Sequence, residues 1–344
     1  MAYSLRRERL GDLLARLAEK RKVVAPVQDG PIVSYRAVQD GSRVTLDFTN
    51  SRPSPKQHLM PQTERIFRYR YDGAGLSLLE EEAPEPQVLF GVRPCDAAAL
   101  LLLDGALGGE IPDAAYQARR DATTVLGLAC EKAGSACCCT AFGLSPGATL
   151  GSDLMLYPDG GRLLAEALTP KGEAILQAAR DLLEWAEDAA LGLLRSAYQS
   201  KPVPLAERLS LDGAAADLET RFEDPAWGEL AERCLGCGIC THLCPTCHCF
   251  ALQDEGNSRE GSRLRCWDSC MYSDFTRMAG GHNPRPSPKE RLRQRFMHKL
   301  NYYPDRHEGR YLCVGCGRCV ERCPVGLHLP AVLEALRKEA APLG

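Results

Sequence analysis

Eight of the 17 cysteines in this 344-residue chain form two copies of one pattern, C-x₂-C-x₂-C-x₃-C-P. The first copy occupies residues 234–245 and the second occupies residues 313–324. Cysteines at this spacing lie close enough along a short loop to bind neighbouring irons of one [4Fe–4S] cluster. The last cysteine of each copy points away from that loop and binds the other cluster in two-cluster proteins. The repeated pattern therefore predicts two [4Fe–4S] clusters.

The same spacing predicts which cysteines share a cluster. In the two-cluster ferredoxin arrangement, three cysteines of one copy combine with the last cysteine of the other copy. The first predicted cluster is bound by Cys234, Cys237, Cys240 and Cys323. The second predicted cluster is bound by Cys313, Cys316, Cys319 and Cys244.

Two further cysteines come directly after apolar runs that are typical of buried strands, residues 87–92 and 123–128. Ligands bind at the carboxyl ends of strands in open α/β sheets. A run of three cysteines follows nearby, and its middle member, Cys138, is expected to point away from its two neighbours. A third iron–sulfur site is therefore predicted from Cys95, Cys130, Cys137 and Cys139. The alternative is a set of buried free thiols, since free cysteine is among the most buried residue types.

Four cysteines remain outside these three sets: Cys247, Cys249, Cys266 and Cys270. They could form another metal site, with His248 as an extra ligand. The favoured interpretation is that they pack around the second cluster as thiols.

Two other uses of cysteine fit this chain poorly. Disulfides belong to oxidising compartments, whereas the first residues are charged and lack the apolar core of a signal peptide. Zinc ribbons use pairs of C-x₂-C motifs, not triplets followed by Cys-Pro. We therefore expect a reducing compartment, the cytoplasm. No apolar run approaches the roughly 18 residues that a membrane span needs, so any membrane contact is expected through a partner.

The length of the chain and its charge distribution indicate two domains, residues 1–224 and 225–344. The C-terminal part contains 17 Lys and Arg against 13 Asp and Glu, a formal charge of +4, and the remainder carries −7. Each oxidised cluster with four thiolates carries about −2. Two clusters would bring the C-terminal part close to neutrality, which argues against a nucleic-acid partner.

The pattern of apolar residues predicts an α+β protein whose N-terminal domain is mixed α/β. We expect an amphipathic helix at residues 5–20, strands at 32–38 and 44–48, and a hairpin formed by 66–71 and 76–79. Residues 49–62 are rich in proline, serine and polar groups, which predicts a surface loop. Further along, an apolar helix is expected through residues 97–103.

The C-terminal domain is predicted to be of the α-helical ferredoxin type, because 68 residues, 245–312, separate the two cysteine motifs. A capping box at Ser287 predicts a helix over residues 288–301, and a last helix is expected over 330–340. The basic side of the first of these helices is expected to lie in solvent, and the alternative is that it faces a cluster or an acidic partner nearby. That helix and the helix at 5–20 are the candidate docking elements.

Several segments together resemble one known group, the 4Fe–4S dicluster family. This family contains the sulfhydrogenase beta subunit, which belongs to NAD(P)-linked [NiFe] hydrogenases, and the A-type iron–sulfur subunit of anaerobic sulfite reductase. The similar segments span about residues 20 to 330, and Cys138 stands where an aromatic residue is expected. The segments that carry the resemblance are 91–96, 137–139, 244–250, 267–270, 281–285 and 313–319.

The resemblance implies an electron-transfer subunit between a flavin subunit that meets NAD(P)H and a terminal redox subunit of the hydrogenase type. The A-type subunit of an anaerobic sulfite reductase, a catalytic iron–sulfur subunit of the heterodisulfide reductase type, and a zinc-bound scaffold or redox sensor remain alternatives. The chain contains no G-x-G-x-x-G after a strand, P-loop, H-E-x-x-H or G-x-S-x-G motif. We therefore predict no catalytic residues and no nucleotide site in this chain.

Overall fold

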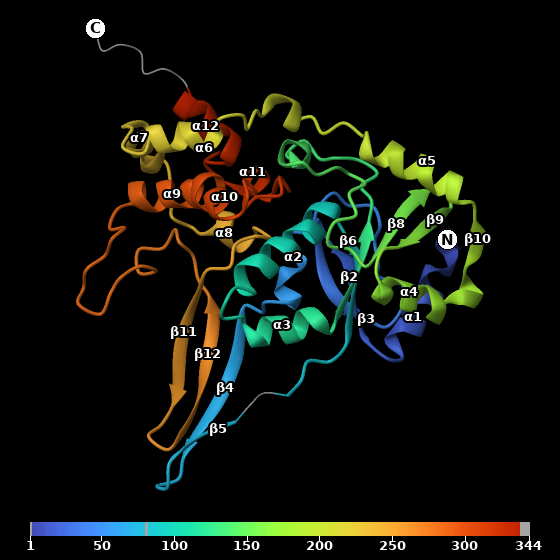
Figure 1. Cartoon of the computed structure of the whole chain (residues 1–344), viewed down its shortest axis with the longest axis horizontal. Helices are drawn as coiled ribbons and strands as arrows, with labels where there is room; N and C mark the ends of the chain where they lie inside the picture. Colours follow the sequence, from blue (N-terminus) through green and yellow to red (C-terminus); the bar gives the residue numbers. More distant parts are fainter. Residues whose placement is uncertain (1, 80–81, 338–344) are drawn as a thin grey trace.

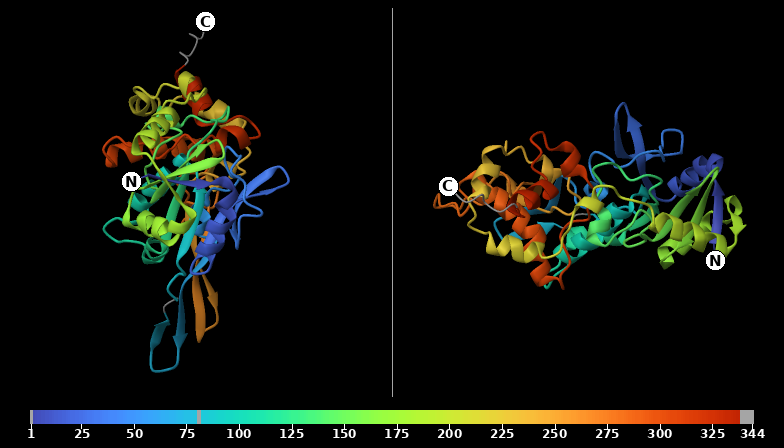
Figure 2. Two further views of the ribbon diagram at one scale, coloured as in Figure 1. Left: turned by 90° about the vertical axis from the view of Figure 1, so that its right-hand side faces the viewer. Right: turned by 90° about the horizontal axis from the view of Figure 1, so that it is seen from above.

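The computed structural model describes residues 2–79 and 82–337, and it confirms the α+β fold class. The N-terminal region is built on a large sheet, and the C-terminal region is mostly helical (Figure 1). A second, smaller sheet projects from the body as an arm, as two further views also show (Figure 2). No helix in the described part of the chain is long and apolar enough to span a membrane.

The large sheet has eight strands in the order β10-β1-β9-β8-β7-β6-β2-β3. Its four central strands, β2, β6, β7 and β8, are parallel to one another, and the outer ones are antiparallel. Every residue of β6 and β7 is buried, as is typical of parallel strands covered on both faces. The strands are β1 (Ala2–Arg6), β2 (Lys22–Asp29), β3 (Ile32–Val38), β6 (Gln87–Val92), β7 (Thr123–Leu128), β8 (Leu154–Asp159), β9 (Arg162–Ala167) and β10 (Glu184–Ala186).

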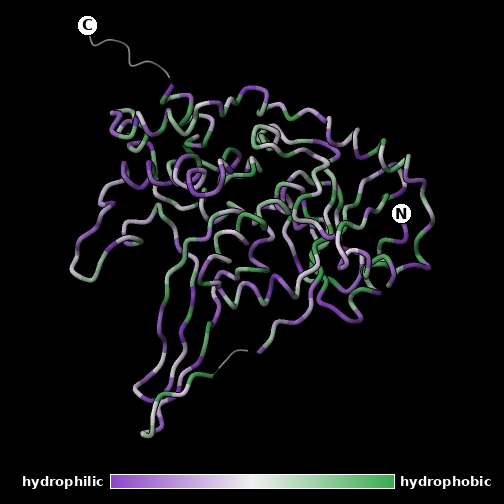
Figure 3. Tube along the Cα trace, in the orientation of Figure 1, coloured by the Kyte–Doolittle hydropathy of each residue, from purple (hydrophilic) through white to green (hydrophobic). Residues whose placement is uncertain are grey.

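Helices cover both faces of this sheet. On one face, α1 (Leu10–Ala18) and α4 (Pro170–Ala178) pack with Val88 and Phe90 of β6. On the other face, α2 (Pro94–Leu107) and α3 (Ala114–Asp121) pack with Leu89, because neighbouring residues of a strand point to opposite faces. A further helix, α5 (Asp188–Gln199), covers β8. Figure 3 shows the hydrophobic residues gathered in these central strands.

The arm is a four-stranded sheet in the order β11-β12-β4-β5. Its strands are β4 (Thr63–Tyr71), β5 (Leu76–Leu79), β11 (Phe250–Gly256) and β12 (Glu260–Trp267). Two strands therefore come from each side of the predicted boundary at residue 224. An ion-pair network strengthens the contact between β12 and β4: Arg265 of β12 is buried and pairs with Glu64 of β4 and with Asp113.

The C-terminal helices pack around a core that includes Trp227, Leu292, Phe296 and Val332. The helix predicted from its capping box begins at Pro288, and Ser287 and Glu290 form that box. The helices are α6 (Ala214–Thr220), α7 (Ala226–Glu232), α8 (Ile239–His242), α9 (Pro288–Met297), a π-helical turn (His298–Tyr302), α10 (Tyr303–Arg306), α11 (Arg318–Arg322) and α12 (Leu329–Arg337).

Two expected elements differ from the structure, and a third extends beyond the described residues. The helix predicted at 5–20 is a strand up to Arg6, and α1 begins only at Leu10. Residues 44–48 form a single bridge and no strand, because the guanidinium of Arg93 binds the carbonyls of Leu46 and Phe48. The last helix is described as far as Arg337, and the rest of its predicted range lies outside the described residues.

Candidate metal centres

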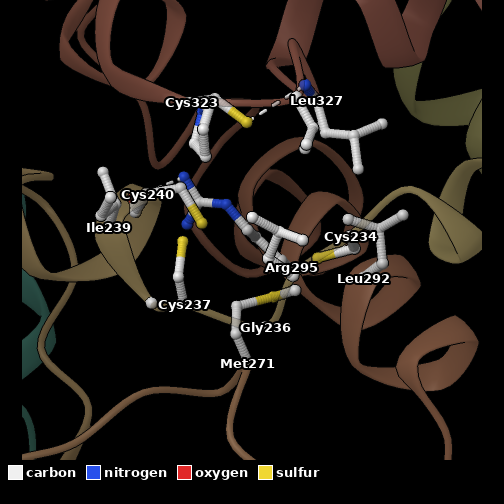
Figure 4. A pocket seen from close by; sticks show the side chains of 14 residues that line it. Cys234, Gly236, Cys237, Ile239, Cys240, Met271, Leu292, Arg295, Cys323 and Leu327 are labelled. Carbon is white, nitrogen blue, oxygen red and sulfur yellow. Dashed lines mark hydrogen bonds between the residues drawn. The ribbon is translucent and has the colours of Figure 1, made fainter.

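The four cysteines predicted for the first cluster line one cavity (Figure 4). Cys234 and Cys237 lie in the loop that leads into α8, Cys240 lies in α8 itself, and Cys323 follows α11. The space between them, including its opening to solvent, measures about 430 Å³. The backbone N–H of Leu327 donates to the sulfur of Cys323 at 3.2 Å. The structure thus brings the four cysteines of this set together around one space.

The four cysteines predicted for the second cluster line a second cavity, which measures about 520 Å³ with its opening to solvent: Cys244, Cys313, Cys316 and Cys319. The N–H of Gly315 points at the sulfur of Cys313, 3.5 Å away. Cys138 also lines this cavity and is buried. It therefore points away from its two neighbours, as predicted, and it forms part of the wall of the second cavity.

The cysteines predicted for the third cluster line a third cavity, which measures about 350 Å³ with its opening to solvent: Cys95, Cys130, Cys137 and Cys139. Cys95 lies in the first turn of α2, after β6, and Cys130 follows β7. The Nδ2 atom of Asn50 lies 4.0 Å from the sulfur of Cys137, and its Oδ1 lies 3.9 Å from that of Cys95. The strand ends therefore bring together the residues that the sequence placed there.

Two glycines of the second cysteine loop allow the second and third cavities to lie against each other. Gly315 has a φ of 59°, and a Cβ atom there would lie 2.4 Å from the carbonyl oxygen of Cys138. Gly317 has a φ of 81°, and a Cβ atom there would lie 2.5 Å from the carbonyl oxygen of Ala136. The N–H of Cys138 also donates to the carbonyl of Gly315 at 2.8 Å. Only glycine permits this backbone approach without strain.

Three buried cations surround the cysteines of residues 240–247. Lys56, Arg295 and Lys299 are 2%, 5% and 4% exposed. Lys299 Nζ lies 3.5 Å from the sulfur of Cys244, and Arg295 Nη1 lies 3.5 Å from that of Cys247. Among the described residues, none of the three cations forms an ion pair with a carboxylate. A buried cation without a negatively charged partner is unfavourable. Negative charge on the cysteine sulfurs, as in metal-bound thiolates, would stabilise these three cations.

This burial contradicts the favoured expectation for the helix at 288–301, that its basic side lies in solvent, because Arg291, Arg295 and Lys299 are buried. It fits the alternative that this side faces a cluster site, since Arg295 and Lys299 approach cysteine sulfurs. Arg293 binds the carbonyl of Phe222 at 2.6 Å. Helix α9 therefore supports the cysteine sites from within, and these buried basic side chains are not available as an exposed docking surface. The apolar side of α1 is likewise buried in the core of the large sheet.

A fourth cation, Arg318, joins the second and third cavities. Its guanidinium forms two hydrogen bonds with Asp96, at 2.6 and 2.8 Å, and also binds Ser51. Arg318 lies between two ligand candidates of the second cavity, and Asp96 follows Cys95 of the third. This ion pair therefore holds α11 against α2.

Burial raises the pKa of most of these thiols. The pKa of Cys313 rises to about 11, and those of Cys316 and Cys319 rise to about 12, chiefly because burial disfavours the thiolate. Burial likewise raises the pKa of Cys130 to about 11 and that of Cys139 to about 12. Metal binding displaces these protons, and the resulting thiolates are stabilised by the metal.

The other four cysteines lie beside these cavities. Cys247 contacts Cys244, Cys249 contacts Cys270, and Cys266 lies in β12 opposite Ala251. The Nδ1 atom of His248 lies 3.1 Å from the carbonyl of Thr246. Within residues 2–79 and 82–337, no three His, Cys, Asp or Glu side chains are arranged to hold a single metal ion, as zinc would require.

Sequence reasoning missed Lys56 and Asn50. Lys56 lies in a short 3₁₀ helix, Pro55–His58, almost 200 residues from the cysteines that it approaches. Both Lys56 and Asn50 belong to the segment 49–62, whose composition predicts a surface loop. Nothing local in the sequence marks either residue as part of a cysteine site.

The fold and the three cysteine-lined cavities define an iron–sulfur protein with a dicluster domain. A family model described as a 4Fe-4S dicluster domain matches residues 233–327. Over 337 residues, the chain is 30% identical to sulfhydrogenase 2 subunit beta of Pyrococcus furiosus, covering 97% of this chain and 98% of that protein. The chain therefore belongs to the 4Fe–4S dicluster family of the sulfhydrogenase beta subunit. No solved structure matches it.

Proposed function

We propose that the chain is the subunit that relays electrons between a flavin subunit, which meets NAD(P)H, and a terminal redox subunit of a cytoplasmic [NiFe] hydrogenase. The observation that carries this proposal is the unbroken series of three cysteine-lined cavities. Arg295 lines both the first and the second cavity. Gly315 and Cys316 line both the second and the third. Such a series suits electron transfer from one end of the chain to the other.

In this proposal the three cysteine sets hold three [4Fe–4S] clusters, which supply one-electron transfer when bound. The residues of this chain then set how readily each site accepts an electron. Positive charge and N–H groups aimed at sulfur stabilise added negative charge, and burial opposes it. The ammonium group of Lys299 beside Cys244 and the backbone N–H of Leu327 beside Cys323 both stabilise added negative charge.

The first cavity lies where electrons could pass to a partner subunit. Cys237 is exposed, and the side chain of Leu235 beside it is 67% exposed. An exposed apolar residue beside an exposed cysteine suits a contact that excludes water and brings a second redox group close. Similarity to a protein named as a sulfhydrogenase subunit favours a partner of the hydrogenase type over a sulfite reductase.

The proposal is tested by measuring electron transfer from NAD(P)H under anaerobic conditions. The chain alone should oxidise no NAD(P)H, because its sequence contains no nucleotide-binding motif. Addition of the flavin subunit should reduce the iron–sulfur centres of this chain, as followed by EPR. Oxidation of NAD(P)H by the chain alone contradicts the relay.

The ligand sets are tested by replacing one cysteine from each motif. Cys323→Ser and Cys234→Ser should alter the same EPR signal, because both residues line the first cavity. Cys244→Ser should alter the other signal of the dicluster domain, together with Cys313→Ser. The unaltered chain should contain about twelve irons. Grouping of Cys244 with Cys234 in this assay contradicts the crossed assignment.

The docking face is tested by Leu235→Glu. The new charge should lower the second-order rate of electron exchange with the partner about tenfold, since a buried unpaired charge weakens an apolar contact by about 1.4 kcal/mol or more. Leu252→Glu is the matched control, because Leu252 is similarly exposed but lies on the arm. Iron content should not change in either variant. Equal rates for the two variants rule out this face.

A further inference from the structure

Two of the cysteines outside the three cavities meet at the base of the arm. Cys249 comes directly before β11, and Cys270 follows β12. Pairing of Phe250 with Trp267 aligns the two strands, and the N–H of Asp268 donates to the carbonyl of Cys249 at 2.9 Å. The sulfur of Cys249 accepts hydrogen bonds from the thiol and from the backbone N–H of Cys270. The hairpin therefore holds the two sulfur atoms in contact.

A cation is buried next to this pair. Lys56 donates to the carbonyl of Cys247 at 2.7 Å and lies 4.3 Å from the ring centre of Trp267. Its position places positive charge near Cys249. Cys249 and Cys270 are both partly buried.

The chemistry of the two sulfurs differs. Hydrogen bonds from Cys270, aided by Lys299 and Lys56, lower the pKa of Cys249 to about 6 against the opposing effect of burial. The same hydrogen bond raises the pKa of Cys270, and burial adds to this effect. A thiolate in contact with a thiol, beside cationic groups, is typical of redox-active dithiols.

We propose that Cys249 and Cys270 form a reversible dithiol–disulfide pair that stores two electrons next to the relay. On reduction, the S–S bond breaks and each sulfur gains one electron; near neutral pH one proton is taken up, by Cys270, and Cys249 remains a thiolate. Oxidation reverses this and leaves the disulfide. The inference rests on the proposed function, because the relay supplies and removes the electrons one at a time.

Residues 244–249 connect the pair to the second cavity. Cys244 lines that cavity, and its sulfur contacts the thiol of Cys247. Cys247 is two residues from Cys249, and Arg295 lies 3.5 Å from its sulfur. The pair thus lies where single electrons from a relay can be collected into a two-electron store.

The test uses the full chain with its iron, purified without oxygen and poised at a series of potentials. Each sample is acid-quenched, alkylated and analysed by mass spectrometry. Cys249 and Cys270 should be joined by a disulfide in oxidised samples and alkylated in reduced ones. The transition should follow a two-electron slope, about 30 mV for each tenfold change in the ratio of disulfide to dithiol.

Three variants complete the test. Cys249→Ser and Cys270→Ser should each abolish the two-electron transition and leave iron content and EPR signals unchanged. Cys266→Ser, which changes a neighbouring cysteine in β12, should retain the transition. Two results overturn the proposal: alkylation of both cysteines at every potential, or loss of about four irons in either variant, which identifies them as metal ligands.

The electron source is tested separately. In the complete complex, NAD(P)H should convert the disulfide to the dithiol. Reduction by dithiothreitol but not by NAD(P)H, in a complex whose EPR signals do respond to NAD(P)H, overturns the coupling of the pair to the relay. EPR signals that do not respond at all overturn the proposed function instead, so the two failures are distinguishable.

Discussion

Replacement of Arg318 by methionine should be the most damaging single change in this chain. Arg318 is 2% exposed, and its guanidinium holds the buried carboxylate of Asp96 with two hydrogen bonds. Methionine leaves that carboxylate buried and unpaired, which destabilises a protein by about 3–5 kcal/mol. The midpoint of thermal unfolding should fall by on the order of 10 °C.

The same change should also disturb two metal sites at once. Arg318 lies between Cys316 and Cys319 of the second cavity, and its partner Asp96 follows Cys95 of the third. The variant should therefore lose iron from both sites and retain the signal of the first. Iron analysis and EPR, with unfolding followed by circular dichroism, check these expectations.

Two further variants separate the ion pair from simple packing. Asp96→Leu combined with Arg318→Met should cost less stability than Arg318→Met alone, because no unpaired charge remains. Arg322→Met is the matched control, since Arg322 lies on the same helix and pairs with Glu321 on the surface, where ion pairs contribute little. A double variant as unstable as the single one assigns the effect to packing.

Local spacing explains why the three cysteine sets could be predicted. Cysteines three residues apart lie in one short loop, and the repeat itself indicates the exchange of the fourth ligand. Cys95 and Cys130 were predicted to lie together by a second local rule, that residues following the carboxyl ends of parallel strands meet at one edge of the sheet. Both cysteines follow neighbouring parallel strands. In each case the signal lies within a few residues of the cysteine concerned.

Contacts between distant segments explain what was missed. The strands β11 and β12 were not predicted, although Gly256-Asn257 is a turn signal between them. Their position depends on pairing with β4, almost 200 residues earlier. The basic residues of α9 were assigned to solvent by the usual rule for charged helix positions. That rule fails here because the cysteine loops that need positive charge pack onto the same helix.

Replacement of Lys299 by methionine should lower the midpoint potential of the second cluster. Lys299 lies in the π-helical turn after α9, and π-helical turns frequently occur at functional sites. Its ammonium group contacts the sulfur of Cys244 and is fully buried, so its charge favours the reduced site. A hydrogen bond to a charged group contributes about 1.5–3 kcal/mol. If about half of this depends on the added electron, the potential should fall by about 30–65 mV.

The fold should tolerate this change. Lys299 also donates to the carbonyl of Leu312, but Thr246 donates to the same oxygen at 2.9 Å and keeps it satisfied. Iron content should therefore remain as in the unaltered chain. Lys299→Arg should recover most of the potential, because it restores a cation at this position.

A redox titration followed by EPR measures the effect, with the second cluster identified as the signal that Cys244→Ser alters. Lys289→Met is the matched control, since Lys289 lies on the same helix but its ammonium is 3.9 Å from the exposed Glu223. That control should leave all potentials unchanged. An equal shift in both variants assigns the effect to net charge, and no shift in Lys299→Met removes Lys299 from the residues that set the potential. A shift confined to the second cluster shows that Lys299, a buried residue outside the cysteine motifs, helps to set the potential of that cluster.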